Sequence, residues 1–279
     1  MRKLIISVTF LLIALSGYSQ TTNSVLTTMF GKKKTVVDRK PIPYQTVREA
    51  DVIWAKLLWR EVNLEEKYNQ RMYFPTTPQD GIYSLIDVFL KGIKEGKIVA
   101  FDTDDDEFKV PMTYETVQKR LGQRVDTVEV EQEDGSTKQV VNNTDMRTTE
   151  VKRYLVKEIW YFDKQSSTMQ KRIIGICPVR VYKKQGIDQT MQQKCFWINY
   201  DECRDFLVKH EVYNSRNDAL RITYDDLFIK RQFNSIIKKE SNVYDNRGIN
   251  TYATGVDTMI ESERITREIF NWEQDLWIY

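Results

Sequence analysis

Histidine is the side chain that most often acts as a general base or a metal ligand near neutral pH, and this sequence contains only one, His210. A Ser-His-Asp triad needs an imidazole base, and multi-histidine metal sites need several such rings. Cys203 falls on the same face of a predicted helix as His210, but seven residues of helical rise place them about 10 Å apart. The two side chains therefore cannot form a nucleophile–base pair on that helix.

Two other motifs match known binding sites only in part. The segment 102–107, Asp-Thr-Asp-Asp-Asp-Glu, has alternate carboxylates like a calcium loop, but Glu107 stands where an EF-hand needs glycine and Thr113 where it needs a bidentate glutamate. We interpret it as a solvated acidic loop, with a weak cation site as the alternative. The segment 92–97, Gly-Ile-Lys-Glu-Gly-Lys, lacks the spacing of a phosphate loop and lies at a helix end whose dipole disfavours anions.

Paired carboxylates are the one catalytic device that the composition allows. The chain has 40 Asp and Glu residues, and the two acids of a glycosidase come from distant segments. No feature singles out a pair, so we name no catalytic residue, no cofactor-binding residue and no metal ligand. A secreted periplasmic hydrolase is kept as the alternative function, and it requires a pocket with two carboxylates about 5 to 10 Å apart.

Charge and the N-terminal residues indicate an exported protein. The 42 basic and 40 acidic residues form no long tract of one sign, which argues against nucleic acid as a partner. Arg2 and Lys3, the apolar run 4–15 and the small residues before Gln20 are typical of a secretory signal peptide, placed at 1–19. No cysteine follows for lipid attachment and no later apolar run approaches about 20 residues, so we expect no membrane insertion.

Helix signals occur along most of the chain. Residues 46–49, Thr-Val-Arg-Glu, match a capping box before an apolar stretch and predict a helix to Val62 with two apolar faces. The clearest 3.6-residue period predicts a helix from Asp80 to Gly96. Similar signals predict helices over 113–121, from 199 to about 210, from 223 to about 239, and from 258 to 276.

Strand signals concentrate in the middle of the chain. Residues 125–130 and 137–141 flank Glu-Asp-Gly-Ser and predict a small polar hairpin. Three segments rich in β-branched and aromatic residues, 151–162, 169–182 and 191–198, predict an antiparallel meander, with a bulge at Gly175 and Pro178. A short strand is expected over 97–101.

These elements predict an α+β fold class. We expect an antiparallel β meander of about three long strands plus a small hairpin, packed with five or six helices. The predicted organisation is a flexible N-terminal stretch, 20–43, followed by a single α+β body, 44–279. Of the three cysteines, Cys177 and Cys195 fall on neighbouring strands and could form a bridge, but we favour buried free thiols for these two and for Cys203.

Residues 54–69, Trp-Ala-Lys-Leu-Leu-Trp-Arg-Glu-Val-Asn-Leu-Glu-Glu-Lys-Tyr-Asn, with Tyr-Phe-Pro at 73–75, resemble the GldN/PorN family of the type IX secretion and gliding machinery. The resemblance covers the chain from about residue 41 to the end. Further matching stretches occur in order at 106–108, 157–164, 172–176, 196–198, 231–233, 235–237, 239–242 and 276–279.

The resemblance implies a non-enzymatic subunit in the periplasm, peripheral to the outer membrane. It implies assembly into a large ring with an outer-membrane lipoprotein (GldK/PorK-like) and contact with the periplasmic part of the inner-membrane motor (GldM/PorM-like). It implies no cofactor and no catalytic residue.

Aromatic residues make up 12% of the chain, which supports a role in protein contacts. Since tryptophan and arginine dominate interface hot spots, we select Trp54, Trp59, Arg60, Trp277 and Tyr279 as candidates for the partner interface. The alternative for each is a packing role within the chain.

Overall fold

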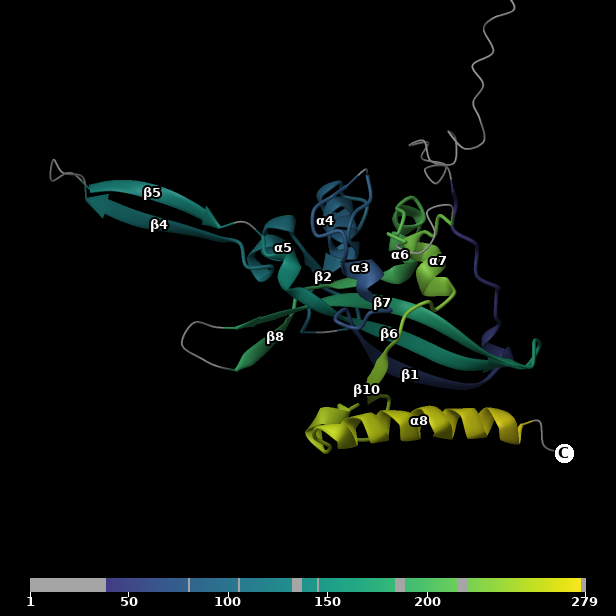
Figure 1. The fold of residues 1–279 in the computed structure, drawn as a ribbon. Helices are drawn as coiled ribbons and strands as arrows, with labels where there is room; N and C mark the ends of the chain where they lie inside the picture. Colours follow the sequence, from purple (N-terminus) through teal and green to yellow (C-terminus); the bar gives the residue numbers. More distant parts are fainter. Residues whose placement is uncertain are drawn as a thin grey trace, which may run out of the picture.

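The computed structural model describes residues 39–79, 81–104, 106–131, 137–144, 146–183, 189–214 and 220–276 of the chain. The expected signal peptide, 1–19, lies outside these residues. The fold is α+β, with an eight-stranded antiparallel sheet and a separate two-stranded hairpin (Figure 1). The order in the sheet is β10-β1-β6-β7-β9-β2-β3, and β8 also pairs with β7.

The strands are β1 (Val52–Asn63), β2 (Ala100–Phe101), β3 (Pro111–Met112), β4 (Arg124–Glu131), β5 (Thr137–Thr144), β6 (Val151–Asp163), β7 (Thr168–Lys183), β8 (Thr190–Lys194), β9 (Trp197–Asn199) and β10 (Ile236–Glu240). The α-helices are α3 (Gln70–Tyr73), α4 (Leu85–Lys94), α5 (Tyr114–Arg120), α6 (Tyr200–Leu207), α7 (Tyr224–Ile229) and α8 (Val256–Asp275).

The helix predicted over 46–62 is wrong, because most of this segment is the strand β1, the second strand from one edge of the sheet. β1 pairs with β6 on one side and with β10 on the other. Its two faces pack into different apolar clusters, with Leu58 in one and Trp59 in another. A strand buried on both faces is as rich in apolar residues as a two-sided helix. The capping-box residues lead only into a 3-10 turn, Glu49–Asp51, which has no side-chain cap.

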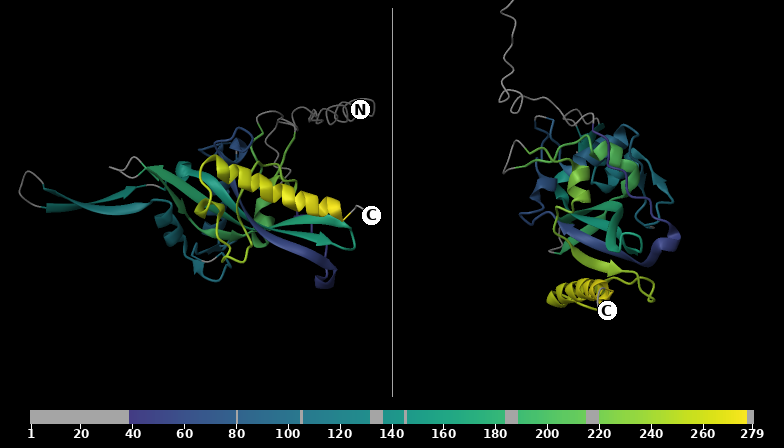
Figure 2. Two further views of the ribbon diagram at one scale, coloured as in Figure 1. Left: turned by 90° about the horizontal axis from the view of Figure 1, so that it is seen from below. Right: turned by 90° about the vertical axis from the view of Figure 1, so that its right-hand side faces the viewer.

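The predicted meander is confirmed in β6, β7 and β8. The third predicted strand is interrupted at Cys195 and Phe196 and divides into β8 and β9. The predicted bulge is also confirmed, since Lys157 pairs with Gly175 while the next residue, Glu158, pairs with Ile173. The predicted hairpin forms from β4 and β5, and Figures 1 and 2 show it projecting away from the sheet.

Three predicted helices are confirmed with small shifts. α4 begins after Ser84, whose side chain caps the helix, and not at Asp80, which lies outside the described residues. α5 and α6 begin directly after Thr113 and Asn199, the first residues of their predicted helices. Gly96 and Gly122 follow α4 and α5 with φ of +68° and +89°, the left-handed conformation that favours glycine after a helix.

The helix predicted from 223 to about 239 is too long. α7 ends at Ile229, and Arg231 takes a left-handed φ of +51° that redirects the chain. Residues 236–240 then form β10, which the sequence analysis missed and which pairs with β1. A pair of isoleucines followed by charged residues fits a helix or a short edge strand equally well, so the pattern did not separate them.

The last helix is confirmed and starts two residues before the predicted Thr258. Ile265 and Ile269 pack it against the sheet, and Trp272 stacks on Trp54 of β1 with ring centroids 4.8 Å apart. Figure 2 shows α8 lying along the sheet, with the side that faces away from the sheet uncovered.

Two apolar cores share one face of β6. Because residues alternate between faces along a strand, Val156, Glu158 and Trp160 all lie on this face. Trp160 belongs to the core beneath α8, and Val156 belongs to the larger core formed with α4, α6 and α7. A carboxylate, Glu158, therefore lies where the two cores meet, beside Arg60 of β1.

The three cysteines are free and buried, as favoured from the sequence, and Cys177 and Cys195 form no bridge. Burial raises the pKa of all three thiols, and for Cys195 the pKa rises to about 11. Little thiolate therefore exists at neutral pH, which disfavours reaction of these groups in the folded protein.

We predict that Gly175→Ala destabilises the fold by about 1 to 3 kcal/mol, because a Cβ there would lie 2.4 Å from the ring of Phe108. Gly248→Ala is the matched control, since its Cβ would make an ordinary contact at 3.5 Å with the carbonyl oxygen of Lys238. Urea unfolding measures both changes. Equal midpoints for the two variants would contradict the close packing at the bulge.

Candidate functional site

Residues 39–48 form an extended segment, here called the strap, that passes α6 and α7 before β1 begins (Figure 1). Two arginines bind its backbone. Arg204 of α6 donates to the carbonyl oxygen of Ile42 at 2.5 Å, and Arg172 of β7 donates to that of Gln45. The strap is therefore held by charge-assisted hydrogen bonds to carbonyl groups.

Tyr44 fixes the middle of the strap. The centroid of its ring lies 4.2 Å from the guanidinium carbon of Arg204 and 4.9 Å from the guanidinium carbon of Arg172. Tyr44 therefore makes a cation–π contact with each arginine. Burial raises the pKa of Tyr44 to about 12. The described end of the stretch 20–43, which was expected to be flexible, is thus attached to the body.

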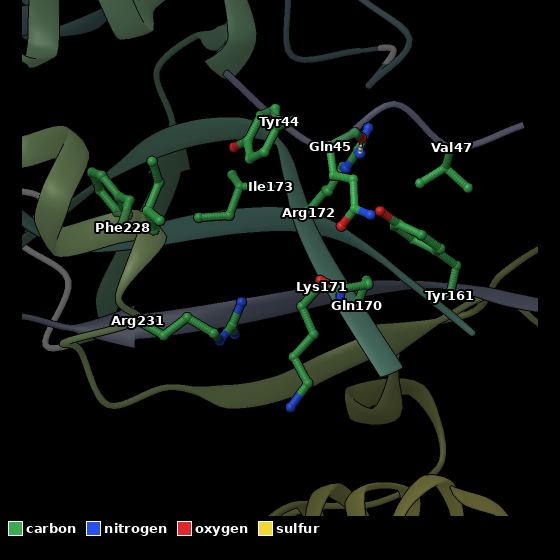
Figure 3. Close-up of a pocket in the computed structure, with 11 residues that line it drawn as sticks. Tyr44, Gln45, Val47, Tyr161, Gln170, Lys171, Arg172, Ile173, Phe228 and Arg231 are labelled. Atoms are coloured by element: carbon green, nitrogen blue, oxygen red, sulfur yellow. Dashed lines mark hydrogen bonds between the residues drawn. The ribbon is translucent and has the colours of Figure 1, made fainter. Parts of the chain in front are cut away.

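A cavity of about 190 Å³, here called the edge pocket, lies between the strap, β7 and the end of α7 (Figure 3). Its lining residues are Tyr44, Gln45, Val47, Tyr161, Gln170, Lys171, Arg172, Ile173, Phe228, Ile229 and Arg231. Four consecutive residues of β7, 170–173, line it although their side chains alternate between faces. The pocket therefore lies at the edge of this strand.

Glu158 is fully buried beside this pocket and carries a charge that needs a partner. Arg231 supplies it, because its Nη2 donates to both carboxylate oxygens at 2.9 Å. The indole Nε1 of Trp160 donates to the same carboxylate at 2.9 Å. The pair joins the centre of β6 to the segment that follows α7.

Two further cations surround Glu158, and we call the four groups the charge cluster. Arg60 donates to Ser235, and its pKa is lowered by burial and also by the charge of Arg231. Lys171 lies 3.9 Å from the ring centroid of Trp160, and its pKa is lowered by burial and then by Arg231. Only one of the three cations, Arg231, is within ion-pair distance of Glu158 in the described part of the chain.

The local fold explains how Arg231 reaches the cluster. Gln232 N donates to the carbonyl of Leu227 and Arg231 N donates to that of Phe228, the hydrogen bonds of a Schellman helix end. Such an end usually has glycine at the left-handed position that Arg231 occupies. The guanidinium is directed toward β7 (Figure 3), and its Nη1 is buried with no hydrogen-bond partner among the described residues.

The lining of the edge pocket offers donors but no carboxylate. It therefore lacks the pair of acids that the alternative hydrolase would need at this cavity. Lys171, Arg172, Arg231 and the tyrosine hydroxyls instead suit an anionic group. Sequence reasoning missed these residues. Their only signal is that Tyr161, Arg172 and Arg231 fall in stretches that resemble the family.

Two carboxylates of the acidic segment 102–107 accept hydrogen bonds from other side chains of the same chain. Asp102 accepts from Arg120 at 2.7 Å, and Asp106 accepts from the indole of Trp59 at 2.5 Å. No cluster of three or more possible metal ligands is found among the described residues.

The structure places the predicted interface residues as follows. Trp54 stacks on α8, Trp59 is buried, and Arg60 binds Ser235 within the charge cluster. Trp277 and Tyr279 lie outside the described residues. The first three side chains are thus engaged by the chain itself, which is the alternative role considered for them.

We predict that Tyr44→Ala loosens the strap. Losing cation–π contacts worth about 1 to 2 kcal/mol should speed trypsin cleavage at Arg48 about tenfold. Tyr213→Ala, at an exposed tyrosine, is the control and should leave the cleavage rate unchanged. Mass spectrometry of a digestion time course measures the rates, and identical rates would mean that Tyr44 does not hold the strap.

Comparison with known proteins identifies a family. The model of the family described as "Gliding motility associated protein GldN" matches residues 47–278, which is most of the chain. No curated protein matches the sequence significantly. Among the described residues, no helix has both the length and the apolar character needed to cross a membrane. The chain belongs to the GldN family of gliding motility associated proteins.

Proposed function

We propose that this chain is a non-enzymatic periplasmic subunit of the type IX secretion and gliding machinery. In this role it forms a large ring with an outer-membrane lipoprotein (GldK/PorK-like) and contacts the periplasmic part of the motor (GldM/PorM-like). The observation that carries the proposal is the family match over residues 47–278. The signal peptide predicted at 1–19 supports export to the periplasm.

The outer side of α8 supports a role in assembly. Large apolar side chains are exposed there and on the preceding loop, and we call this set the α8 surface: Val243, Tyr244, Tyr252, Val256, Met259 and Ile260. Ile260 is 60% exposed and Val243 is 91% exposed. Apolar surface of this kind usually marks a contact with another molecule. We assign it to contact with a neighbouring subunit of the ring.

Two features favour a binding protein over the hydrolase. The edge pocket is lined by donors without a carboxylate pair, and Nδ1 of the single histidine, His210, donates to the backbone carbonyl oxygen of Phe206. Repeated contacts between different surfaces close into a ring when the rotation between neighbours allows it. A subunit of this kind needs exposed contact surfaces more than a reactive group.

We predict that Ile260→Asp disrupts assembly without unfolding the chain. Removing an apolar contact of about 2 kcal/mol should lower recovery of the large particle by about thirtyfold, while stability changes by less than about 0.5 kcal/mol. Asn271→Asp is the matched control, because it adds the same charge to an exposed position of α8. Affinity purification from cross-linked cell envelopes measures the particle.

The same purification tests the proposed partners. The unmodified chain should be recovered with a lipoprotein in a large particle. Recovery as a free monomer from intact cells would contradict the proposed function. Equal recovery of the Ile260→Asp and Asn271→Asp chains would contradict only the assignment of the α8 surface.

A further inference from the structure

The edge of β7 beside the edge pocket is open. β7 pairs with β9 at Gly175 and Ile176, and with β8 over 179–183. Over 170–173, among the residues that the structure describes, β7 pairs only with β6, which lies on the opposite edge of the strand from the pocket. The strap passes nearby, but it is held through the side chain of Arg172 and not through a strand pairing. Backbone groups of alternate residues along 170–173 therefore face the pocket without a strand partner.

The charge cluster has an excess of positive charge. Arg60, Lys171 and Arg231 surround one buried carboxylate, Glu158, and the other acid acting on Lys171 is Glu273 of α8. Lys171 is exposed and the other two are half-buried, so the cost of this arrangement is the repulsion between like charges, which an additional anion would lower. Two of the three basic groups of the charge cluster, Lys171 and Arg231, line the pocket itself. The excess is therefore concentrated where a ligand would enter.

Arg231 provides an independent observation. A non-glycine residue in the left-handed conformation costs about 1 to 2 kcal/mol, and glycine would end α7 without this cost. The ion pair with Glu158 uses Nη2, while Nη1 is buried with no partner in the described chain. A buried donor left without an acceptor costs about 1 to 3 kcal/mol. Arg231 is therefore kept at this position at a cost, and it adds a positive charge to the pocket lining.

We propose that the edge pocket binds the carboxylate of an acidic side chain carried by an extended segment of another polypeptide, which lies along residues 170–173 of β7. The carboxylate accepts a hydrogen bond from Lys171, and the positive charge of Arg231 in the same lining stabilises it. The backbone of the segment pairs with the open edge of the strand, a common mode of peptide recognition. Tyr44 and Phe228 supply the apolar walls that contact the rest of the segment.

The size of the pocket sets the class of ligand. About 190 Å³ accommodates a single side chain, and it is smaller than the roughly 300 to 1,000 Å³ typical of small-molecule sites. Binding of a free small acid would leave the strand edge unused. The open edge is thus the observation that favours a peptide over a free carboxylic acid.

The test uses the purified chain and a fluorescent probe peptide, acetyl-Val-Glu-Val-Glu-Val-amide, with the Gln-for-Glu peptide as its neutral counterpart. Fluorescence anisotropy at low salt measures both affinities. The Glu peptide should bind at least about tenfold more tightly, since a charge-assisted hydrogen bond contributes more than a neutral one. Neither a ring nor a lipoprotein is needed, so the result is separate from the assembly experiment.

Two variants and a control locate the binding. Lys171→Gln should weaken binding of the Glu peptide about tenfold, and Lys164→Gln, an exposed lysine in the turn before β7, should change it less than about twofold. Ile229→Glu places a competing carboxylate at a half-exposed position of the lining and should also weaken binding about tenfold. Thermal unfolding checks that each variant is folded.

Three outcomes would overturn the proposal. Equal affinity for the Glu and Gln peptides would exclude recognition of a carboxylate. Equal effects of Lys171→Gln and Lys164→Gln would mean that surface charge alone attracts the peptide. Displacement of the peptide by free glutarate at equal concentration would show that the strand edge contributes nothing. Failure of glutarate to displace it supports the proposal.

Discussion

The ion pair between Glu158 and Arg231 is the interaction on which the arrangement of the C-terminal half depends. A carboxylate buried at the centre of the sheet is tolerated only with a paired and hydrogen-bonded cation, because desolvation costs several kcal/mol per ion. Arg231 meets this need from the end of α7, and its backbone conformation turns the chain toward β10. β10 then pairs with β1 and supplies Ile237 to the core under α8. One buried charge thus connects α7, β10 and α8.

The sequence predicts those parts of the fold whose residue pattern is compatible with only one type of secondary structure. The meander over 151–198 is rich in β-branched and aromatic residues and is divided by polar turns, so only a strand assignment fits. The segment 52–63 is different, because both faces of the strand carry apolar residues, such as Leu58 and Trp59, and neither face is uniformly polar enough to reveal a two-residue period. Residues 236–240 form a strand because β1 offers them a partner, and that partner is about 180 residues away in the sequence.

The residues of the candidate site could not be predicted from the sequence either, because tertiary structure brings them together. Lys171 and Arg231 lie together because the register of β6 and β7 places Lys171 opposite Trp160, and because α7 ends where it does. Neither fact is visible in residue spacing. Trp54 and Trp59, selected from the sequence as interface candidates, contact α8 and Asp106 within the chain, and their part in a partner interface stays a prediction.

The position of α8 has a consequence for how the molecule opens. The helix is joined to the sheet by one apolar stripe, the stacked Trp272 and a hydrogen bond from Ile237 N to Ser262 Oγ. Lifting it away would break no bond of the β ladders. Its amide protons should therefore exchange with solvent through a subglobal opening whose free energy is below that of complete unfolding. Such an opening would bring water to the charges buried beneath the helix while the strands remain paired.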